Sequence, residues 1–294
     1  MSFGRLITAM VTPFDERLNI DWDMTGKLID YLIEEQKSDS LVVSGTTGES
    51  PTLTDDEKVE LVRFAVKHAA GRCKIIAGTG SNETAHSVQL TRRAEEVGAD
   101  GILLVAPYYN KPSQEGIYQH FRTIAEATSL PVVLYNVPSR TVVSMSVETT
   151  LRLAAVPNIV ATKECASLEQ MTEIVAQAPE GFVLYSGDDA VTLPSLSVGG
   201  HGIVSVASHI VGAQMKDLIH AFLDGRVRDA QEINAKLFPV FKGLFNCPHP
   251  VPNPVAVKHA LALRGLPVGG VRLPLVPATE AEGRFVENLL NESV

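Results

Sequence analysis

Lys163 stands at the end of an apolar run, next to the final Glu164 of residues 158–164, and is the residue in the sequence whose type and position most clearly suggest chemistry. The run is typical of a strand buried on both faces. A charged ammonium beside such a strand is costly unless it is paired or loses its proton. A desolvated lysine with a lowered pKa is a good amine nucleophile toward carbonyl compounds. The pattern therefore indicates imine chemistry at Lys163.

A simpler interpretation of Lys163 also exists. Its ammonium could reach solvent at the strand end and pair with the adjacent carboxylate of Glu164. Structural ion pairs of this kind also shift pKa values, and for a lone lysine they are the commoner explanation. The elements around residues 158–164 must decide between the two interpretations.

Eight short apolar runs alternate with segments of helical periodicity. The runs lie at residues 6–11, 40–43, 73–77, 101–106, 131–135, 158–164, 182–185 and 202–206. Alternating strands and helices predict a parallel sheet with right-handed crossovers. Eight such units fit an α/β fold of the (β/α)8 TIM-barrel type, which usually spans about 250 residues. A doubly wound open sheet is the alternative.

The pattern changes near residue 211, after which apolar residues recur only at helical spacing. We expect the first of these helices to close the barrel and the others to form a C-terminal helical appendage. The predicted division is a catalytic barrel at residues 1–225 and an α-helical domain at residues 226–294.

In a barrel of this type, the active site lies at the C-terminal ends of the strands. Hydroxyl groups, one lysine and one arginine dominate the predicted strand ends, which carry Thr46, Thr47, Tyr108, Tyr109, Tyr135, Arg140, Lys163, Gly187 and Val204. No His, Cys and carboxylate set at metal spacing occurs there. We therefore expect neither a metal nor a cofactor.

This set of side chains suits one reaction type. A lysine amine forms a carbinolamine and then an imine with an α-keto acid, and the imine lets a neighbouring C–H lose its proton to give an enamine. The enamine carbon then attacks an aldehyde. Each step moves a proton, which a tyrosine hydroxyl beside the amine can carry. Backbone N–H groups of a Gly/Thr turn and an arginine can bind substrate carboxylates.

Each of these elements has a simpler explanation when taken alone. Tyr135 could be a core residue with a tethered hydroxyl, and residues 45–48 could form only a tight turn. Residues 78–80 make a poor dinucleotide fingerprint, because Glu83 stands at the third glycine position. Tyr108 and Tyr109 could be an aromatic pair at a subunit interface. The joint occurrence at successive strand ends is what favours the chemical interpretation.

Composition limits the partners. The chain has 294 residues, a formal net charge of −9 and no basic run, which argues against nucleic acid. No apolar segment approaches the roughly 20 residues needed to span a bilayer, and no secretory signal precedes the first run. Three widely spaced cysteines, Cys73, Cys165 and Cys247, are expected to be small buried thiols. We therefore expect a cytoplasmic protein that does not bind membranes.

Several motifs resemble those of the dihydrodipicolinate synthase family. They are Gly-Thr-Thr-Gly-Glu-Ser at 45–50, Pro-Tyr-Tyr-Asn-Lys-Pro at 107–112, Tyr-Asn-Val-Pro-Ser-Arg at 135–140, Lys-Glu at 163–164, Ser-Gly-Asp-Asp at 186–189, Gly-Gly-His-Gly at 199–202 and Asn-Pro-Val-Ala-Val-Lys at 253–258. The first motif and the lysine are shared with the wider pyruvate-dependent class I aldolases, which include N-acetylneuraminate lyase. The double tyrosine and the Asn-Val-Pro-x-Arg motif are more specific, and the similarity extends over nearly the whole chain.

The resemblance implies a reaction and residue roles. Pyruvate would condense with L-aspartate 4-semialdehyde through a Schiff base, giving 4-hydroxy-tetrahydrodipicolinate for lysine and diaminopimelate synthesis. Lys163 would form the imine, Tyr135 would transfer protons, and Thr46 and Tyr109 would complete a proton relay, with Tyr109 supplied across a tight dimer interface. The groups expected to hold substrates are Thr47, the Val204 backbone, Gly187 and Arg140, the last on the carboxylate of the aldehyde. A homotetramer built from two tight dimers is implied.

An effector pocket is also implied. Lysine-inhibited members of the family bind lysine at a dimer interface, in a pocket that corresponds here to Ser50, Pro51, Asn82, His86 and Tyr108. Those members usually carry alanine where Pro51 stands and an acid where His86 stands. Because His86 removes the natural partner of a lysine ammonium, we expect weak or absent inhibition by lysine.

Two other functions remain open from the sequence. A sugar-acid aldolase or N-acetylneuraminate lyase would keep the imine and change the aldehyde, although Arg140 favours an aldehyde that carries a carboxylate. A non-catalytic sensor of keto acids would bind the same ligand without turnover, although the lysine, tyrosine and hydroxyl set disfavours it.

Overall fold

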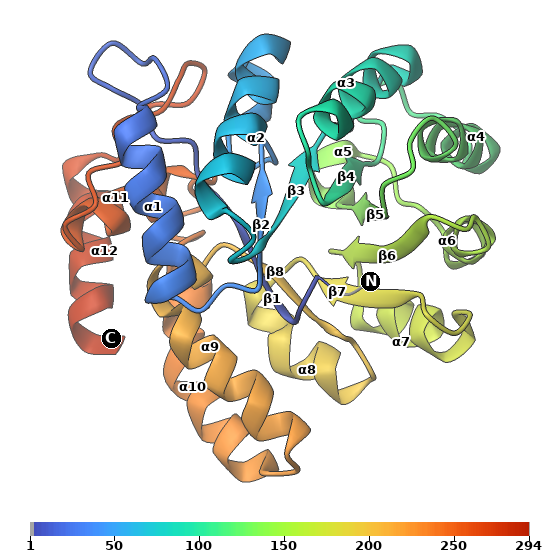
Figure 1. Cartoon of the computed structure of the whole chain (residues 1–294). Coiled ribbons are helices and arrows are strands. Elements are labelled where there is room, and N and C mark those ends of the chain that lie inside the picture. The colour runs from blue at the N-terminus through green and yellow to red at the C-terminus, as the bar shows by residue number, and fades with distance from the viewer. Residues whose placement is uncertain (1–2, 294) are drawn as a thin grey trace.

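Eight parallel strands close into a barrel in the computed structural model, which describes residues 3–293 (Figure 1). Each strand pairs with its neighbours in sequence, and β8 pairs with β1. The strands are β1 Leu6–Ala9, β2 Ser40–Val43, β3 Lys74–Gly78, β4 Gly101–Val105, β5 Val132–Asn136, β6 Ile159–Glu164, β7 Val183–Ser186 and β8 Gly202–Ser205. The predicted (β/α)8 barrel is confirmed, and the open sheet is wrong.

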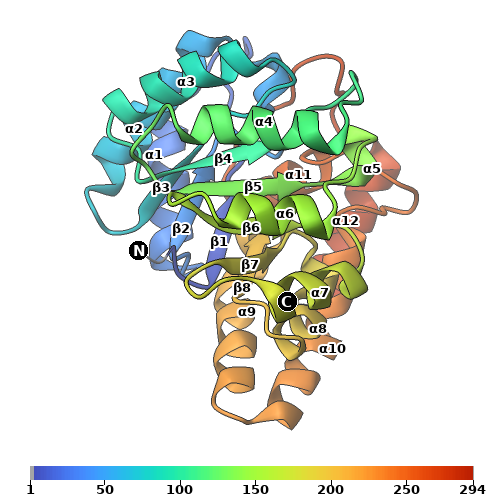
Figure 2. The ribbon, with the colours of Figure 1, turned by 90° about the vertical axis from the view of Figure 1, so that its right-hand side faces the viewer.

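Helices surround the barrel in the order that the sequence predicts (Figures 1 and 2). They are α1 Trp22–Glu34, α2 Asp55–Ala69, α3 Thr84–Glu96, α4 Gln114–Ala125, α5 Pro138–Thr141, α6 Val147–Ala154, α7 Leu168–Gln177, α8 Thr192–Ser197, α9 Ser208–Leu223, α10 Val227–Gly243, α11 Val255–Leu263 and α12 Glu280–Ser293, with short 3-10 turns η1 Ser50–Thr52 and η2 Asp189–Val191. No helix among residues 3–293 is long and apolar enough to cross a membrane.

Local signals explain where these elements begin. Thr54 caps α2, and its side chain and that of Glu57 exchange hydrogen bonds with each other's backbone N–H groups in a capping box. The predicted strands agree with the observed ones within about two residues. The largest difference is in the first run, which the sequence predicts to continue to residue 11, whereas β1 ends at Ala9. Pro13, which has no N–H to donate, follows soon after.

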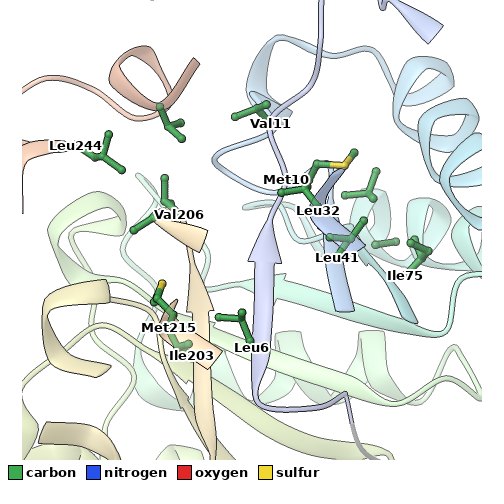
Figure 3. Close-up of a cluster of buried hydrophobic side chains, with 14 of the residues drawn as sticks. Leu6, Met10, Val11, Leu32, Leu41, Ile75, Ile203, Val206, Met215 and Leu244 are labelled. Carbon is green, nitrogen blue, oxygen red and sulfur yellow. The ribbon is translucent and has the colours of Figure 1, made fainter. Parts of the chain in front are cut away.

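Side chains of the strands alternate between two apolar layers, because successive residues of a strand point to opposite faces. One layer fills the barrel lumen and includes Ile7, Val42, Ile76, Val133 and Val204. The other lies between the strands and the helices, where Leu6 of β1 and Ile203 of β8 join the same cluster as Met215 of α9 (Figure 3). This alternation decides which residues at each strand end can face the lumen.

The C-terminal helices form a group beside the barrel. Helices α9 and α10 extend side by side away from it (Figure 2), and α12 packs against both α10 and α11. Helix α9 also packs on β1, as expected of the helix that closes the barrel. The division into residues 1–225 and 226–294 stays a prediction, and residues 1, 2 and 294 lie outside the described part of the chain.

Candidate active site

Lys163 lies near the end of β6 and is only 6% exposed. Tyr135 of β5 is its register partner on one side, and Tyr185 of β7 is its partner on the other. The Nζ atom of Lys163 lies 4.1 Å from the centroid of the Tyr135 ring. Burial lowers the pKa of Lys163, and the positive charge of Arg140 acts in the same direction, while Asp189 opposes it. The environment therefore favours the neutral amine that attacks a carbonyl.

Glu164 does not pair with Lys163, so the simpler interpretation of the lysine is wrong. Adjacent residues of a strand point to opposite faces, and the carboxylate of Glu164 lies among other partners. It accepts hydrogen bonds from Asn136 Nδ2 at 3.0 and 3.2 Å, from the Ala166 N–H at 2.8 Å and from Gln170 Nε2 at 3.2 Å. Burial raises the pKa of Glu164 to about 7, although these hydrogen bonds oppose that rise.

Tyr135 fits both interpretations that the sequence left open, because it belongs to the lumen cluster and also lines two adjoining cavities, which are described below. Its hydroxyl interacts with the hydroxyl of Thr46 and with the thiol of Cys165. Burial strongly raises the pKa of Tyr135. The phenol therefore stays protonated near neutral pH and is placed to donate a proton and take it back.

A cavity of about 230 Å³ gives access to Lys163. Its walls include six of the eight residues predicted to act in catalysis or substrate binding: Thr46, Thr47, Tyr135, Arg140, Lys163 and Gly187. Strands β5 and β6, helix α5 and the turns after β2 and β7 supply them. The structure thus brings together residues that lie far apart in the sequence, as expected if the strand ends form one site.

A side chain at Gly187 would collide with Cys165 and Lys163. A Cβ atom added at this glycine would lie 2.3 Å from Cys165 Sγ and 2.8 Å from Lys163 Cε. The glycine therefore leaves room for the side chains of Lys163 and Cys165. A role in binding the substrate itself stays a prediction.

Two of the predicted residues lie outside the cavity walls. The side chain of Tyr109 is 85% exposed, and its backbone has a positive φ of 75°. It does not line the cavity of its own chain, which is compatible with the expected role across a subunit interface. Val204 is buried in the lumen of the barrel, and its predicted backbone contact with pyruvate stays a prediction.

A second cavity of about 450 Å³ adjoins the first and shares Thr46, Tyr135 and Arg140 with it. All five residues of the predicted effector pocket line this second cavity: Ser50, Pro51, Asn82, His86 and Tyr108. His86 Nε2 lies 2.7 Å from Asp55 Oδ2, and Lys58 Nζ lies 3.4 Å from the other carboxylate oxygen, Asp55 Oδ1. The structure thus gathers these residues, but their role as an effector site stays a prediction.

The sequence of this chain matches one family along almost its whole length. The profile of the dihydrodipicolinate synthetase family covers residues 2–293. The chain belongs to this family. It is 56% identical to the 4-hydroxy-tetrahydrodipicolinate synthase of Bacillus subtilis, over 99% of this chain and 100% of the relative.

Solved structures of the family have the same fold. A dihydrodipicolinate synthase from Bacillus anthracis is 51% identical, with a TM-score of 0.96 over 99% of this chain and 98% of its own. A dihydrodipicolinate synthase from Cyanidioschyzon merolae, with lysine bound, is 44% identical, with a TM-score of 0.95 over the same shares of the two chains.

Some residues of this dihydrodipicolinate synthetase family site were missed by sequence reasoning. Cys165 was expected to be a small buried thiol like Cys73 and Cys247, but it is partly exposed and lines the cavity beside Tyr135. Its position two residues after Lys163, on the same face of the strand end, is the signal that could have identified it. Burial raises the pKa of Cys165 to about 11, which keeps the thiol protonated.

Asp189 is a second residue that the prediction omitted. It is buried, and its carboxylate accepts hydrogen bonds from the N–H groups of Val206 at 3.2 Å and Ala207 at 2.8 Å, so it fixes the segment that follows β8.

His209 lies in the same region and has a structural role, because it links the segments that follow β1 and β8. Its Nε2 accepts a hydrogen bond from the N–H of Val11, and its Nδ1–H donates to the Val206 carbonyl. No cluster of three metal-binding side chains occurs in residues 3–293.

Proposed function

We propose that this chain is a 4-hydroxy-tetrahydrodipicolinate synthase, a lyase of the class I aldolase type that condenses pyruvate with L-aspartate 4-semialdehyde in lysine and diaminopimelate biosynthesis. The observation that carries the proposal is the buried Lys163 with its lowered pKa, whose Nζ lies 4.1 Å from the centroid of the Tyr135 ring beside a small cavity that both residues line. Family membership and the names of relatives 50–56% identical support the choice of substrates.

The first half of the proposed reaction loads pyruvate onto the enzyme. The neutral amine of Lys163 attacks the keto carbon, and Tyr135 donates a proton to the carbonyl oxygen as it becomes the hydroxyl of a carbinolamine. Loss of water gives the imine. The methyl carbon then loses a proton to the relay of Tyr135, Thr46 and the partner's Tyr109, which leaves an enamine. Thr47 and the backbone at Val204 hold the pyruvate carboxylate, with Gly187 beside the lysine.

The second half forms a carbon–carbon bond and releases the product. The enamine carbon attacks the aldehyde, whose oxygen takes a proton from the relay. The amino group of the bound semialdehyde then attacks the imine carbon, which closes the ring and displaces the amine of Lys163. The guanidinium of Arg140, exposed at the rim of both cavities, binds the carboxylate of the semialdehyde.

Assembly and location belong to the same proposal. We propose a homotetramer of two tight dimers in which the highly exposed Tyr109 of each chain reaches the site of its partner. Analytical ultracentrifugation checks the assembly, and a monomer with full activity contradicts it. The cytoplasmic location expected from the sequence is checked by cell fractionation.

We propose that lysine inhibits this enzyme weakly or not at all, because the second cavity binds lysine poorly. His86 stands where an acid would meet the ammonium of an incoming lysine, and the carboxylate of Asp55 already contacts His86 Nε2 at 2.7 Å and Lys58 Nζ at 3.4 Å, so it offers little to that ammonium. The structure of the relative from Cyanidioschyzon merolae has lysine bound, so the shared fold can hold this ligand. Half-maximal inhibition at sub-millimolar L-lysine contradicts the proposal.

Borohydride reduction tests the central step. With pyruvate present, mass spectrometry should find the reduced adduct on Lys163, and an unlabelled Lys163 overturns the proposal. Aspartate semialdehyde, N-acetylmannosamine and glyceraldehyde should then be compared as second substrates. Fast turnover of a sugar aldehyde favours the sugar-acid aldolase, whereas turnover far below one per second with every aldehyde favours the sensor.

A further inference from the structure

A buried ion pair joins the C-terminal helices to the mouth of the barrel. Lys258 lies on α11 and Glu49 lies in the turn that follows β2, and Lys258 Nζ is 2.7 Å from Glu49 Oε1. The two side chains are 3% and 1% exposed. Removing two charges from water is costly, so a pair this deeply buried needs further contacts to hold it.

Those further contacts come from the segment that follows α11 and from the loop that follows β1. Lys258 Nζ donates to the Gly270 carbonyl at 2.6 Å and lies 4.2 Å from the ring centroid of Phe14. The other oxygen of Glu49 accepts the N–H of Arg272 at 2.9 Å. Burial lowers the pKa of Lys258 to about 8, while the negative charge of Glu49 opposes that change.

Glu49 is part of the segment at residues 45–49, which we name the threonine turn because it carries Thr46 and Thr47. The backbone N–H of Glu49 donates to the Thr46 carbonyl at 3.1 Å. Asn253, which precedes α11, donates to the Thr47 hydroxyl at 2.8 Å. The C-terminal segment therefore holds this turn at residues 47 and 49, on either side of Gly48.

The backbone of Glu49 is strained. Its φ of 58° and ψ of 36° lie in the left-handed region, which is unfavourable for a residue with a long side chain. Such a conformation persists only where surrounding contacts determine it, and it is found most often at functional sites. Here the surrounding contacts are the ion pair with Lys258 and the hydrogen bond from Arg272.

We propose that Glu49 and Lys258 are a positioning pair that fixes the threonine turn, so that the C-terminal helices complete the site for the keto acid. The inference rests on the proposed function, in which Thr47 holds the pyruvate carboxylate and Thr46 belongs to the proton relay. Neither Glu49 nor Lys258 touches the substrate. Their effect reaches it through the position of the two threonines.

The alternative is a pair that only stabilises the fold. The ion pair between Lys216 of α9 and Asp39, just before β2, provides a matched comparison. It is also partly buried, with side-chain exposures of 18% and 29%, but Asp39 lies at the opposite end of β2 from the threonine turn. Lys216→Met should lower stability and leave pyruvate binding unchanged.

Three variants separate the two roles. Lys258→Met leaves the Glu49 carboxylate buried and unpaired, so it should lower thermal stability strongly. Glu49→Gln combined with Lys258→Met leaves no unpaired charge and should recover much of that stability. Glu49→Asp keeps both charges, suits the left-handed backbone better, and only shortens the side chain.

The readout is the pyruvate concentration that gives half-maximal borohydride adduct on Lys163, measured beside the melting temperature. In Glu49→Asp and in the double variant, this concentration should rise about tenfold or more, the equivalent of one displaced hydrogen bond, even where the melting temperature is near wild type. Lys216→Met should lower the melting temperature and leave the pyruvate concentration for half-maximal adduct unchanged.

The outcomes are distinguishable. Folded Glu49→Asp and double variants with the wild-type pyruvate dependence overturn the positioning role and leave the proposed function intact. If wild-type protein gives no adduct at Lys163, the proposed function fails and this inference fails with it. The inference is supported if the pyruvate concentration for half-maximal adduct rises in Glu49→Asp and in the double variant but not in Lys216→Met.

Discussion

Asn136 Nδ2 donates to both carboxylate oxygens of Glu164, at 3.0 and 3.2 Å, across the neighbouring strands β5 and β6. This pair lies one residue beyond Tyr135 and Lys163, which face each other in the same register. The two pairs point to opposite faces of the sheet. The hydrogen bonds between Asn136 and Glu164 therefore fix the alignment of β5 and β6. That alignment sets the distance between the amine of Lys163 and the phenol of Tyr135.

The first prediction is that Asn136→Ala lowers kcat more than its loss of stability explains. The variant removes a donor to buried Glu164 and the acceptor of the Met145 N–H, which should cost about 2–3 kcal/mol in unfolding free energy. The looser alignment should lower kcat about tenfold, with less effect on the KM for pyruvate.

Asn158→Ala is the control for this prediction. Asn158 lies just before β6, at the other end of the strand from Lys163, and donates to three backbone carbonyls. It should destabilise the protein by a similar amount, as measured by urea unfolding, and keep wild-type kcat. Equal loss of kcat in both variants contradicts the positioning effect of Asn136.

The second prediction concerns the hydroxyl of Tyr135. Tyr135→Phe keeps the ring over Lys163 and removes the proton carrier that interacts with Thr46 and Cys165. Turnover should fall about 10²-fold or more while the fold stays intact. Tyr185→Phe is the control: it flanks Lys163 on β7, but its hydroxyl donates to the Gly4 carbonyl at 2.9 Å. Steady-state kinetics should show near-normal kcat for the control, and unchanged kcat in Tyr135→Phe refutes the proton-transfer role.

The third prediction is a loss of stability in mild acid that depends on His209. Burial lowers the pKa of His209 to about 4, from an ordinary value near 6.5. Between pH 6.5 and pH 4, His209 is therefore protonated in the unfolded chain and neutral in the folded chain. The free energy of unfolding falls as the pH falls from 6.5 to 4. The contribution of this histidine should be about 3 kcal/mol. Burial also lowers the pKa of His120 to about 4, so the wild-type protein should lose stability through both residues.

His209→Asn isolates the contribution of His209. Its amide can still donate to the Val206 carbonyl, but the Val11 N–H loses its acceptor. At pH 7 the variant should be less stable than wild type by about 1–3 kcal/mol. Because Asn does not titrate, urea unfolding should show this difference shrinking or reversing near pH 4. A constant difference from pH 7 to pH 4 shows that His209 titrates normally.

Much of the site can be predicted from the sequence, because the C-terminal ends of all eight strands meet at one face of the barrel. Lys163, Tyr135, Thr46 and Gly187 each stand at or just after a strand end, so recognising the strands is enough to bring them together. Glu49 and Lys258 could not be paired this way. They are 209 positions apart, and their contact depends on how α11 packs against the barrel, which no local pattern encodes. Cys165 is harder to place from sequence, because its thiol packs against Gly187 of the next strand end, in space that any other side chain there would fill.

The last prediction is that Gly187→Ala blocks imine formation through a steric conflict that a second substitution relieves. Gly187 is not among the glycines with positive φ, so alanine brings no backbone penalty, and the whole effect comes from its Cβ. That atom would lie 2.3 Å from Cys165 Sγ and 2.8 Å from Lys163 Cε. The crowding should cost about 1–3 kcal/mol of stability and displace the lysine amine, lowering the rate of borohydride trapping with pyruvate at least about tenfold. Adding Cys165→Ala removes the nearer obstacle, so the double variant should recover part of both losses. Cys165→Ala alone measures the cost of losing the thiol, and a double variant no better than Gly187→Ala shows that the contact with the thiol is not the cause.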